Sequence, residues 1–355
     1  MIATHLKLSL RLHIYKYNKP FVLLSSKNAL ICCAYRSSRA MPSSKVCGDP
    51  LPVSTPIVNL SDGRQLAYKE QGVPKDEAIY KAIVVHGFDS SKDLYLPLSK
   101  DFVEKMGLYI VTIDRPGYGE SDPNPKRTIK SDTFDVQELA DHLNLGSKFY
   151  VVGLSLGNYI TWGFIKYLPH RLAGAALVVP VVNYWWPSFP SKMSKEAYKM
   201  QPLRDQIKLW IAHNAPGLLH WWMTQSLLPS SILDKPPMVL NAKDVETMQK
   251  MALVPNLNEH KIRQQGEDES LYRDLKVGFG KWEFDPMELK SPFEGKMGSI
   301  HLWQGYQDRL VPYQLQRFLA KKLPWIKYHE VTNGGHLIIH DHVLCEEIFK
   351  CLLLD

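Results

Sequence analysis

The stretch that decides the fold is Tyr150-Val151-Val152-Gly153-Leu154-Ser155-Leu156-Gly157. A short apolar run leads into a Gly-x-Ser-x-Gly pattern, and the amphipathic segment 158–168 follows directly. This order predicts a strand, a sharp turn and a helix, with Ser155 at the apex of the turn. Glycine suits positions 153 and 157, because the incoming strand and the outgoing helix pass too close for a Cβ atom. The pattern alone is common, but on a strand–turn–helix it is specific.

Further strands and helices alternate on both sides of this unit. The segments 57–60 and 65–70 flank an Asp-Gly turn and predict an antiparallel hairpin. Apolar runs predict other strands at 82–85, 109–113, 173–182, 299–303 and 327–331. Helices are expected at 94–106, at 132–143 with a cap at Ser131 or Asp132, at 314–323 and at 341–354. This alternation predicts an α/β fold, a mostly parallel central sheet flanked by helices.

The pattern changes after residue 183, because no strand is predicted for more than a hundred residues. Helical patterns there cover 195–212, 217–228, 242–252 and 271–290. We therefore expect residues 184–296 to form a helical cap inserted into the core, which comprises 47–183 and 297–355. Ligands of such sheets bind outside the carboxyl ends of the strands, so the loops after those strands are the place for a site.

The N-terminal segment 1–46 differs from the rest in charge. Residues 1–48 hold eight Lys or Arg and no acid, whereas the remainder holds 35 basic and 36 acidic side chains. The net charge of +7 therefore comes from the N-terminal segment. The remainder of the chain is close to neutral, which argues against a nucleic-acid partner. Basic, serine-rich composition predicts either a chloroplast or mitochondrial targeting segment on a cytoplasmic-type core, or a disordered extension. The apolar stretch 21–35 is too short and too polar to span a bilayer.

The positions of the cysteines and histidines indicate whether disulfide bonds or a metal site are expected. None of the five cysteines lies between residues 48 and 344, which predicts a reducing compartment and no disulfide framework. The sequence contains no Cys-x-x-Cys or His-Glu-x-x-His, so neither a metal nor another cofactor is expected. A cluster of His336, His340 and His342 is the alternative metal-binding interpretation.

The loops after the strands carry residues suited to nucleophilic catalysis. The hydroxyl of Ser155 needs a base within hydrogen-bond reach. His336 follows a strand in Asn333-Gly334-Gly335-His336, whose glycines we expect to let the ring swing toward Ser155. His340 and His342 are expected at the surface. The base needs a carboxylate that orients it, and Asp308, after the strand 299–303, is the predicted acid.

Other polar residues near strand ends receive supporting roles. Asp114 and Arg115 are expected to brace a loop, and Asn183 offers no carboxylate after its strand. Two backbone N–H groups are needed to bind an oxyanion. Leu156, which follows the nucleophile, and Phe88, which follows His86-Gly87, are the predicted donors. The residues expected to support these loops are His86, Gly87, Gly153 and Gly157.

Taken in order, these motifs resemble an α/β-hydrolase-fold protein. They are His86-Gly87, Asp114-Arg115-Pro116-Gly117-Tyr118-Gly119-Glu120-Ser121 and the Gly-x-Ser-x-Gly pattern, with the triad order serine, aspartate, histidine. From about residue 46 onward the chain is most similar to plant α/β-hydrolases of undefined substrate, which are soluble or membrane-anchored. That similarity is carried by the stretches 121–127, 168–174 and 303–312. The chain departs from that group in its basic start, where members often have a hydrophobic anchor, and in Asn158, where many have a small residue.

The resemblance implies acyl-enzyme chemistry. Epoxide hydrolases and haloalkane dehalogenases of this fold carry aspartate at the position of Ser155, so the serine favours a serine hydrolase with Ser155, Asp308 and His336 as its triad. Acyltransferase or hydroxynitrile-lyase-type chemistry with the same residues, and a small-molecule receptor on the hydrolase fold, remain alternatives. The sequence does not determine the oligomeric state.

Aromatic residues of the expected cap suggest the substrate class. Some of them should line a pocket for the apolar acyl group of a carboxylic ester or related acyl compound, while others belong to the core. The stretch 220–223 also suits contact with a membrane surface. The aromatic residues are Tyr184, Trp185, Trp186, Trp210, Trp221, Trp222, Phe279, Trp282 and Phe284.

Overall fold

We describe the protein from a computed structural model, in which residues 55–225, 240–253, 261–293 and 297–355 are described. The predicted extension 1–46, the first residues of the predicted core and part of the predicted helix 217–228 lie outside these ranges. The described part of the chain forms one unit.

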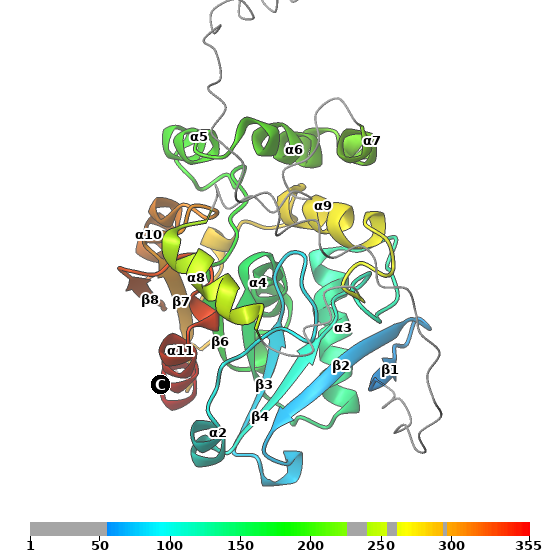
Figure 1. The fold of residues 1–355 in the computed structure, drawn as a ribbon, viewed down its shortest axis with the longest axis vertical. Helices are drawn as coiled ribbons and strands as arrows, with labels where there is room; N and C mark the ends of the chain where they lie inside the picture. The colour runs from blue at the N-terminus through cyan, green and yellow to red at the C-terminus, as the bar shows by residue number, and fades with distance from the viewer. Residues whose placement is uncertain (1–54, 226–239, 254–260, 294–296) are drawn as a thin grey trace, which may run out of the picture. The chain divides into compact units, whose positions relative to one another are not determined.

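An eight-stranded sheet lies at the centre of the molecule (Figure 1). The strand order is β1-β2-β4-β3-β5-β6-β7-β8; β2 pairs antiparallel with β1 and β4, and the other neighbours are parallel. This confirms the predicted mostly parallel α/β fold and the predicted hairpin, in which Asn59 pairs with Gln65. The strands are β1 Ile57–Asn59, β2 Gln65–Gly72, β3 Tyr80–Val85, β4 Leu108–Ile113, β5 Phe149–Leu154, β6 Leu172–Val178, β7 Ile300–Gly305 and β8 Ile326–Val331.

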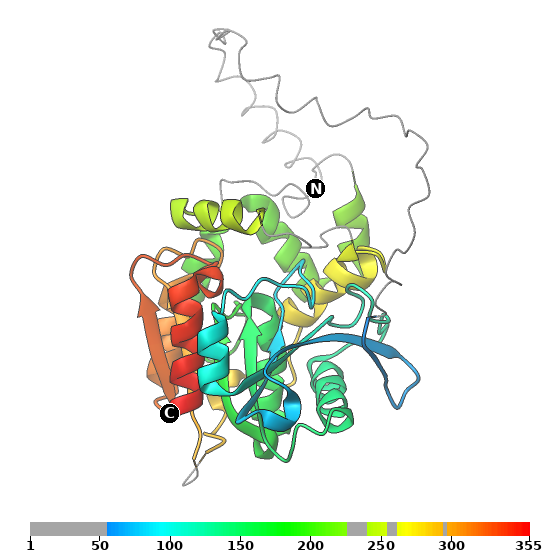
Figure 2. The ribbon, with the colours of Figure 1, turned by 60° about the horizontal axis from the view of Figure 1, so that its bottom comes forward.

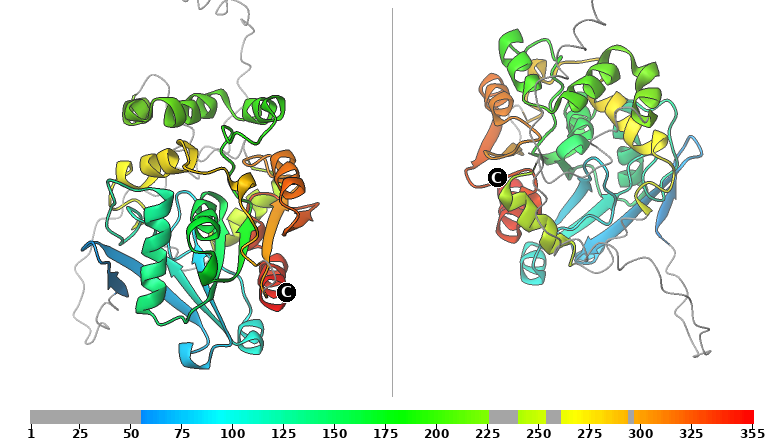
Figure 3. Two further views of the ribbon diagram at one scale, coloured as in Figure 1. Left: turned by 180° about the vertical axis from the view of Figure 1, so that it is seen from behind. Right: turned by 45° about the horizontal axis from the view of Figure 1, so that its top comes forward.

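Helices cover both faces of the sheet. On one face, α2 (Lys100–Met106) and α11 (His342–Leu354) lie side by side (Figure 2). On the other lie α3 (Ile129–His142), α4 (Asn158–Tyr167) and α10 (Tyr313–Lys322), of which α3 and α4 are in front in the rear view of Figure 3. Side chains of β3 alternate between two hydrophobic clusters, one containing Ile83 and Val85 and the other Ala82 and Val84. Burial on both faces explains why the sequence of such a strand is continuously apolar.

Two helix starts differ from the sequence-based expectation. α2 begins at Lys100 rather than at residue 94, because Pro97 interrupts the segment and Ser99 caps the helix by accepting a hydrogen bond from Phe102 N–H. α3 begins three residues earlier than predicted, with a capping box formed by Thr128 and Ser131. Asp132, a predicted cap, instead lies buried inside the helix.

The helical segment between β6 and β7 contains α5 Ser191–Lys199, α6 Leu203–Asn214, α7 Leu219–Thr224, α8 Ala242–Met251 and α9 Arg273–Phe279. The predicted helix 195–212 is two helices, because Pro202 at the N-cap of α6 fixes the backbone and lacks an N–H donor. Likewise, the predicted helix 271–290 ends at Phe279. In Figure 1, α5, α6 and α7 form a row, and α9 lies between that row and the sheet.

Short helical turns complete the described chain. They are the 3-10 helices η1 Lys75–Glu77, η2 Ser155–Gly157, η3 Pro169–Arg171, η4 Pro216–Leu218, η8 Pro286–Glu288 and η9 Ile338–His340, and the π-helical turn η7 Asp268–Tyr272. Within the described ranges, no helix has both the length and the apolar character needed to cross a membrane.

Candidate active site

Ser155 lies in a tight turn between a strand and a helix. β5 ends at Leu154, the 3-10 turn η2 begins at Ser155, and α4 follows at Asn158. Ser155 has a φ of 49°, a left-handed conformation that non-glycine residues rarely adopt and that marks strained functional turns. A Cβ atom added to Gly157 would lie 2.3 Å from the carbonyl oxygen of His86, and one added to Gly153 would lie 2.2 Å from Thr161 Oγ1. Close packing therefore requires both glycines.

Asn158, which the sequence marked only as a departure from similar proteins, braces this turn. Its side-chain amide donates to the carbonyl oxygen of Ser155 at 3.1 Å and to that of Val178, at the end of β6, at 3.0 Å. The side chain is fully buried. A glycine at this position could not tie the turn to the neighbouring strand, so Asn158 contributes to holding Ser155 in its conformation.

The structure brings Ser155, His336 and Asp308 together from three strand ends. His336 Nε2 lies 2.8 Å from Ser155 Oγ, and His336 Nδ1 lies 2.8 Å from Asp308 Oδ2. With Nδ1–H donating to the carboxylate, Nε2 is left to accept the serine proton. The serine hydroxyl, the ring and the carboxylate thus form a continuous hydrogen-bonded chain.

Asp308 is oriented by donors other than His336. Its Oδ1 accepts hydrogen bonds from the backbone N–H groups of Leu310 at 2.8 Å and Val311 at 2.9 Å. Its Oδ2, which faces His336, also accepts from Gln304 Nε2 at 3.2 Å. The carboxylate is buried and cannot rotate away without losing these bonds.

Asp244, at the start of α8, is a second acid beside His336 that was not among the residues predicted from the sequence. Its carboxylate accepts from the backbone N–H groups of His336 at 3.0 Å and Leu337 at 2.8 Å. A Cβ atom added to Gly335 would lie 2.2 Å from Asp244 Oδ2. Glycine at position 335 thus allows close packing against Asp244, while the expected swing of the ring stays a prediction. Asn241-x-x-Asp244 is readable in the sequence only as a helix N-cap, because its contact with His336 depends on the tertiary fold.

Burial and nearby carboxylates act in opposite directions on the pKa of His336. Burial lowers it, but the charge of Asp308 and its hydrogen bond outweigh burial, and Asp244 adds to them, so the pKa is raised above 6.5. The protonated ring stabilises the folded state below pH 6.5, and this contribution is lost as the pH rises through the raised pKa.

The acid limb of the pH–activity profile should report this raised pKa. A general base must be neutral, so kcat/KM for a neutral ester is expected to fall on acidification with an apparent pKa above 6.5. In Asp244→Asn, which removes one of the charges that raise the pKa, the limb should move to lower pH. Profiles of kcat/KM for the two proteins provide the measurement. A wild-type limb below pH 6.5, or one that Asp244→Asn leaves in place, would contradict this account.

His340 and His342 form hydrogen bonds with the segment before α2. His340 Nδ1 donates to the carbonyl oxygen of Tyr95 at 2.6 Å, and His342 Nδ1 donates to that of Pro97 at 2.7 Å. The expectation that both lie at the surface is correct for His342, which is exposed, but wrong for His340, which is partly buried and whose pKa is lowered to about 4 by burial. No group of three potential metal ligands occurs within the described ranges.

The loop that carries Phe88 lies directly against Ser155. A Cβ atom added to Gly87 would lie 3.1 Å from Ser155 Cβ. In the described part of the chain, the Phe88 N–H group has no hydrogen-bond partner. Leu156 is the second residue of η2, and N–H groups in the first turn of a helix lack an intrahelical acceptor. The two amides predicted to bind an oxyanion therefore belong to segments that flank Ser155.

His86 is a buried neutral residue that ties two loops together. Its Nε2 accepts from the backbone N–H of Arg115 at 3.1 Å, so Nδ1 carries the proton and donates to the carbonyl oxygen of Gly87 at 2.8 Å. Burial and then the charge of Arg115 hold the pKa of His86 well below 6.5. Asp114 accepts from the backbone and side chain of Lys92, which fits the loop-bracing role expected of it.

The aromatic residues between β6 and β7 divide by exposure. Tyr184, Trp186 and Phe279 are buried, whereas Trp210 and Trp221 are 51% and 61% exposed. Trp186 packs edge-on against Trp162 of α4. Several of these residues therefore belong to the core, as expected for part of this set.

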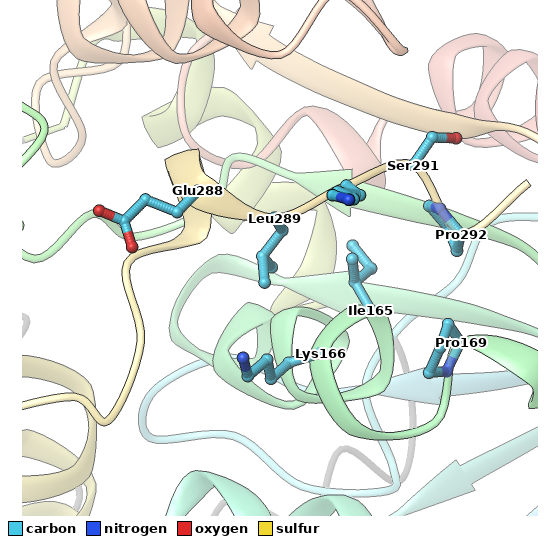
Figure 4. Close-up of a pocket in the computed structure, with 8 residues that line it drawn as sticks. Ile165, Lys166, Pro169, Glu288, Leu289, Ser291 and Pro292 are labelled. Atoms are coloured by element: carbon cyan, nitrogen blue, oxygen red, sulfur yellow. The ribbon is translucent and has the colours of Figure 1, made fainter. Parts of the chain in front are cut away.

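A pocket in the described part of the chain lies away from Ser155. It is formed by the C-terminal end of α4, by Pro169, by Glu288 at the end of η8 and by residues 289–292 (Figure 4). Ser155 precedes the opposite end of α4, a ten-residue helix about 15 Å long. The pocket is therefore separate from the hydrogen-bonded chain of Ser155, His336 and Asp308.

Comparisons with known proteins agree with this architecture. A family described as the alpha/beta hydrolase fold matches residues 83–343. Among solved structures, an enol-lactonase from Burkholderia xenovorans LB400 has a TM-score of 0.57 at 16% identity, covering 84% of this chain and 100% of its own. A thermophilic esterase from Thermogutta terrifontis has a TM-score of 0.52 at 18% sequence identity, and the match covers 85% of this chain and 98% of the esterase.

A bromoperoxidase from Bacillus anthracis has a TM-score of 0.53 at 17% identity, covering 85% of this chain and 100% of its own. At these identities the likeness concerns the fold alone. No curated protein is significantly similar to the chain in sequence.

Proposed function

Because this chain belongs to the alpha/beta hydrolase fold family, we propose that it is a serine hydrolase that cleaves a carboxylic ester or related acyl compound through an acyl-enzyme. The observation that carries the proposal is the chain of two 2.8 Å hydrogen bonds from Ser155 through His336 to Asp308. A binding protein has no need of a base aligned on a serine in a strained turn. This arrangement therefore favours catalysis over the receptor alternative.

The proposed reaction has two halves. Ser155 Oγ attacks the carbonyl carbon while His336 Nε2 takes its proton, and the Phe88 and Leu156 amides bind the oxyanion that forms. The tetrahedral intermediate collapses as the protonated His336 gives its proton to the leaving alcohol. Water then attacks the acyl-enzyme with the same base, and the acid is released. Throughout, Asp308 holds the ring orientation and stabilises the imidazolium.

We also propose that the helical segment 184–296 acts as a cap whose aromatic side chains bind an apolar acyl group. Gly278 of α9 supports this position, because a Cβ atom added there would lie 2.5 Å from a side-chain carbon of Leu156. Asn183 donates to the carbonyl oxygen of Gly280 at 2.8 Å, which ties the end of α9 to the chain after β6. The segment thus borders the proposed oxyanion site, where it could contact a bound acyl chain.

Labelling with a fluorophosphonate tests the activated serine directly. We expect one adduct on the wild-type protein by intact mass, and none on Ser155→Ala, because only a serine deprotonated by a neighbouring base reacts readily. A folded wild-type protein that forms neither an adduct nor a hydrolysis product from short-chain aryl esters would refute the acyl-enzyme mechanism. The wild-type protein should also stop forming the adduct at pH values below the pKa of His336, where the ring is protonated and cannot act as a base.

A further inference from the structure

The peptide between Gly87 and Phe88 is held from its carbonyl side by two donors. The carbonyl oxygen of Gly87 accepts from His86 Nδ1 at 2.8 Å and from Arg115 Nη2 at 2.7 Å. A trans peptide is planar, so its C=O and N–H groups point in opposite directions. Fixing the oxygen of Gly87 therefore also fixes the direction of the Phe88 N–H, the proposed oxyanion donor.

Arg115 is in turn oriented by a residue of the helical segment between β6 and β7. Asp274, in α9, accepts from both terminal nitrogens of Arg115, with Nη2 at 2.7 Å. Both side chains are fully buried. Tyr118 donates to the same carboxylate at 2.8 Å. Nη2 thus bridges Asp274 and the carbonyl oxygen of Gly87, and a planar guanidinium suits such a bridge because its donors have fixed directions.

A second ion pair reaches the same loop from the same helical segment. Arg263 binds Asp89 through two hydrogen bonds, from Nε to Oδ1 at 2.8 Å and from Nη2 to Oδ2 at 2.6 Å. Asp89 directly follows Phe88 and has a φ of 52°. Two arginines therefore hold the Gly87–Phe88 peptide from either side. Arg115 binds the carbonyl oxygen of Gly87, and Arg263 binds Asp89, the residue after Phe88.

We propose that the helical segment between β6 and β7 positions the Phe88 amide for the oxyanion through the Asp274–Arg115 and Arg263–Asp89 ion pairs. Arg115 and Arg263 are positioning residues, because they act through the peptide that carries the donor. This inference rests on the proposed acyl-enzyme function and extends it. It assigns to the helical segment a role in the chemical step besides covering the site.

If the two ion pairs only attached the helical segment to the core, their loss would not affect binding of the oxyanion. A thionoester substrate distinguishes this structural role from the proposed positioning role. Its C=S sulfur is a weaker hydrogen-bond acceptor than a carbonyl oxygen, so a well-placed donor favours the oxygen ester. The ratio of kcat/KM for an aryl ester to that for its thiono analogue therefore reports the alignment of Phe88 N–H. Loss of folded enzyme lowers both rates equally and leaves this ratio unchanged.

The ratio is expected to fall about tenfold in Arg263→Gln. This is less than the 10²- to 10³-fold effect of removing an oxyanion donor, because the Phe88 N–H would be misaligned and not lost. Asp89→Asn should give a similar fall, since asparagine tolerates the positive φ but lacks the charge and the second acceptor oxygen that Arg263 Nε and Nη2 bind. The double variant should fall no further, because both changes remove one interaction. Arg115→Lys should also lower the ratio, because a lysine ammonium lacks the planar array of donors with which the guanidinium binds Asp274 and Gly87 together.

Arg273→Gln is the matched control. Arg273 lies in α9, pairs with Glu269 at 2.6 Å and donates to the carbonyl oxygen of Pro125 at 2.8 Å. Neither of these partners belongs to the loop 86–89, so the ratio should keep its wild-type value. A ratio unchanged in Arg263→Gln, Asp89→Asn and Arg115→Lys, with an active wild-type protein, would overturn the inference and leave the hydrolase proposal intact. A wild-type protein inert toward both esters and toward fluorophosphonate would overturn both.

Discussion

Ser155→Ala is expected to lower kcat for an aryl ester by about 10⁴- to 10⁶-fold while leaving the protein folded. Without Oγ no acyl-enzyme forms, and only binding and the oxyanion donors remain to accelerate attack by water. The comparison is made under saturating substrate, with the folded fraction checked by chemical denaturation. Residual activity within about tenfold of the wild type would contradict the assignment of Ser155 as the nucleophile.

Two companion variants make this result specific. Ser155→Gly should be equally inactive but at least as stable as the alanine variant, because glycine adopts a φ of 49° without steric cost. His336→Ala added to Ser155→Ala should cause almost no further loss, since the base has no function without the hydroxyl that it deprotonates. A further loss as large as that of His336→Ala alone would show that the two residues act independently.

Asp274→Ala is expected to have the largest effect on stability, about 3–5 kcal/mol lost from the free energy of unfolding. Asp274 is the carboxylate that Arg115 and Arg127 share, and all three side chains are buried. Arg127 keeps Asp132 at 2.6 Å, but Arg115 would be left as a buried charge without a counter-ion. Urea denaturation of the two proteins measures the difference.

The control for this experiment is Asp268→Asn, at the start of η7. Asp268 is half exposed and pairs with His220, which is also exposed. Such a pair contributes little, so the free energy of unfolding should stay within about 0.5 kcal/mol of the wild type. If Asp274→Ala costs less than about 1 kcal/mol, water or a rearranged acid must compensate Arg115, and the buried cluster has less importance for stability than its geometry indicates.

The sheet and the proposed triad were predictable because they depend on local patterns. Apolar runs identified the buried strands, and the turn chemistry around Ser155 places a residue at a strand end whatever the rest of the chain does. His336 and Asp308 also follow strands directly, so the parallel arrangement alone brings them to one edge of the sheet. Helix ends were predicted less well: Pro97 and Pro202 each interrupted a helical pattern that hydrophobic periodicity had extended through them.

The supporting residues could not be predicted, because their roles depend on contacts between distant segments. Asp244 approaches His336 across 92 residues, and Asp274 approaches Arg115 across 159. In the sequence both are ordinary acids in helical segments, with nothing to distinguish them from exposed neighbours such as Asp268. Their identification required the tertiary structure, which also shows close packing around Gly334 and Gly335.

The distance along the chain between Arg115 and Asp274 also has a consequence during synthesis. A polypeptide leaves the ribosome from its N-terminus at about 5–20 residues per second, so Asp274 follows Arg115 by roughly 8–30 s. Strands β1 to β6 are complete before their buried arginine has its counter-ion. We therefore expect the native burial of Arg115 to be completed only after α9 has been made, with the guanidinium hydrated until then.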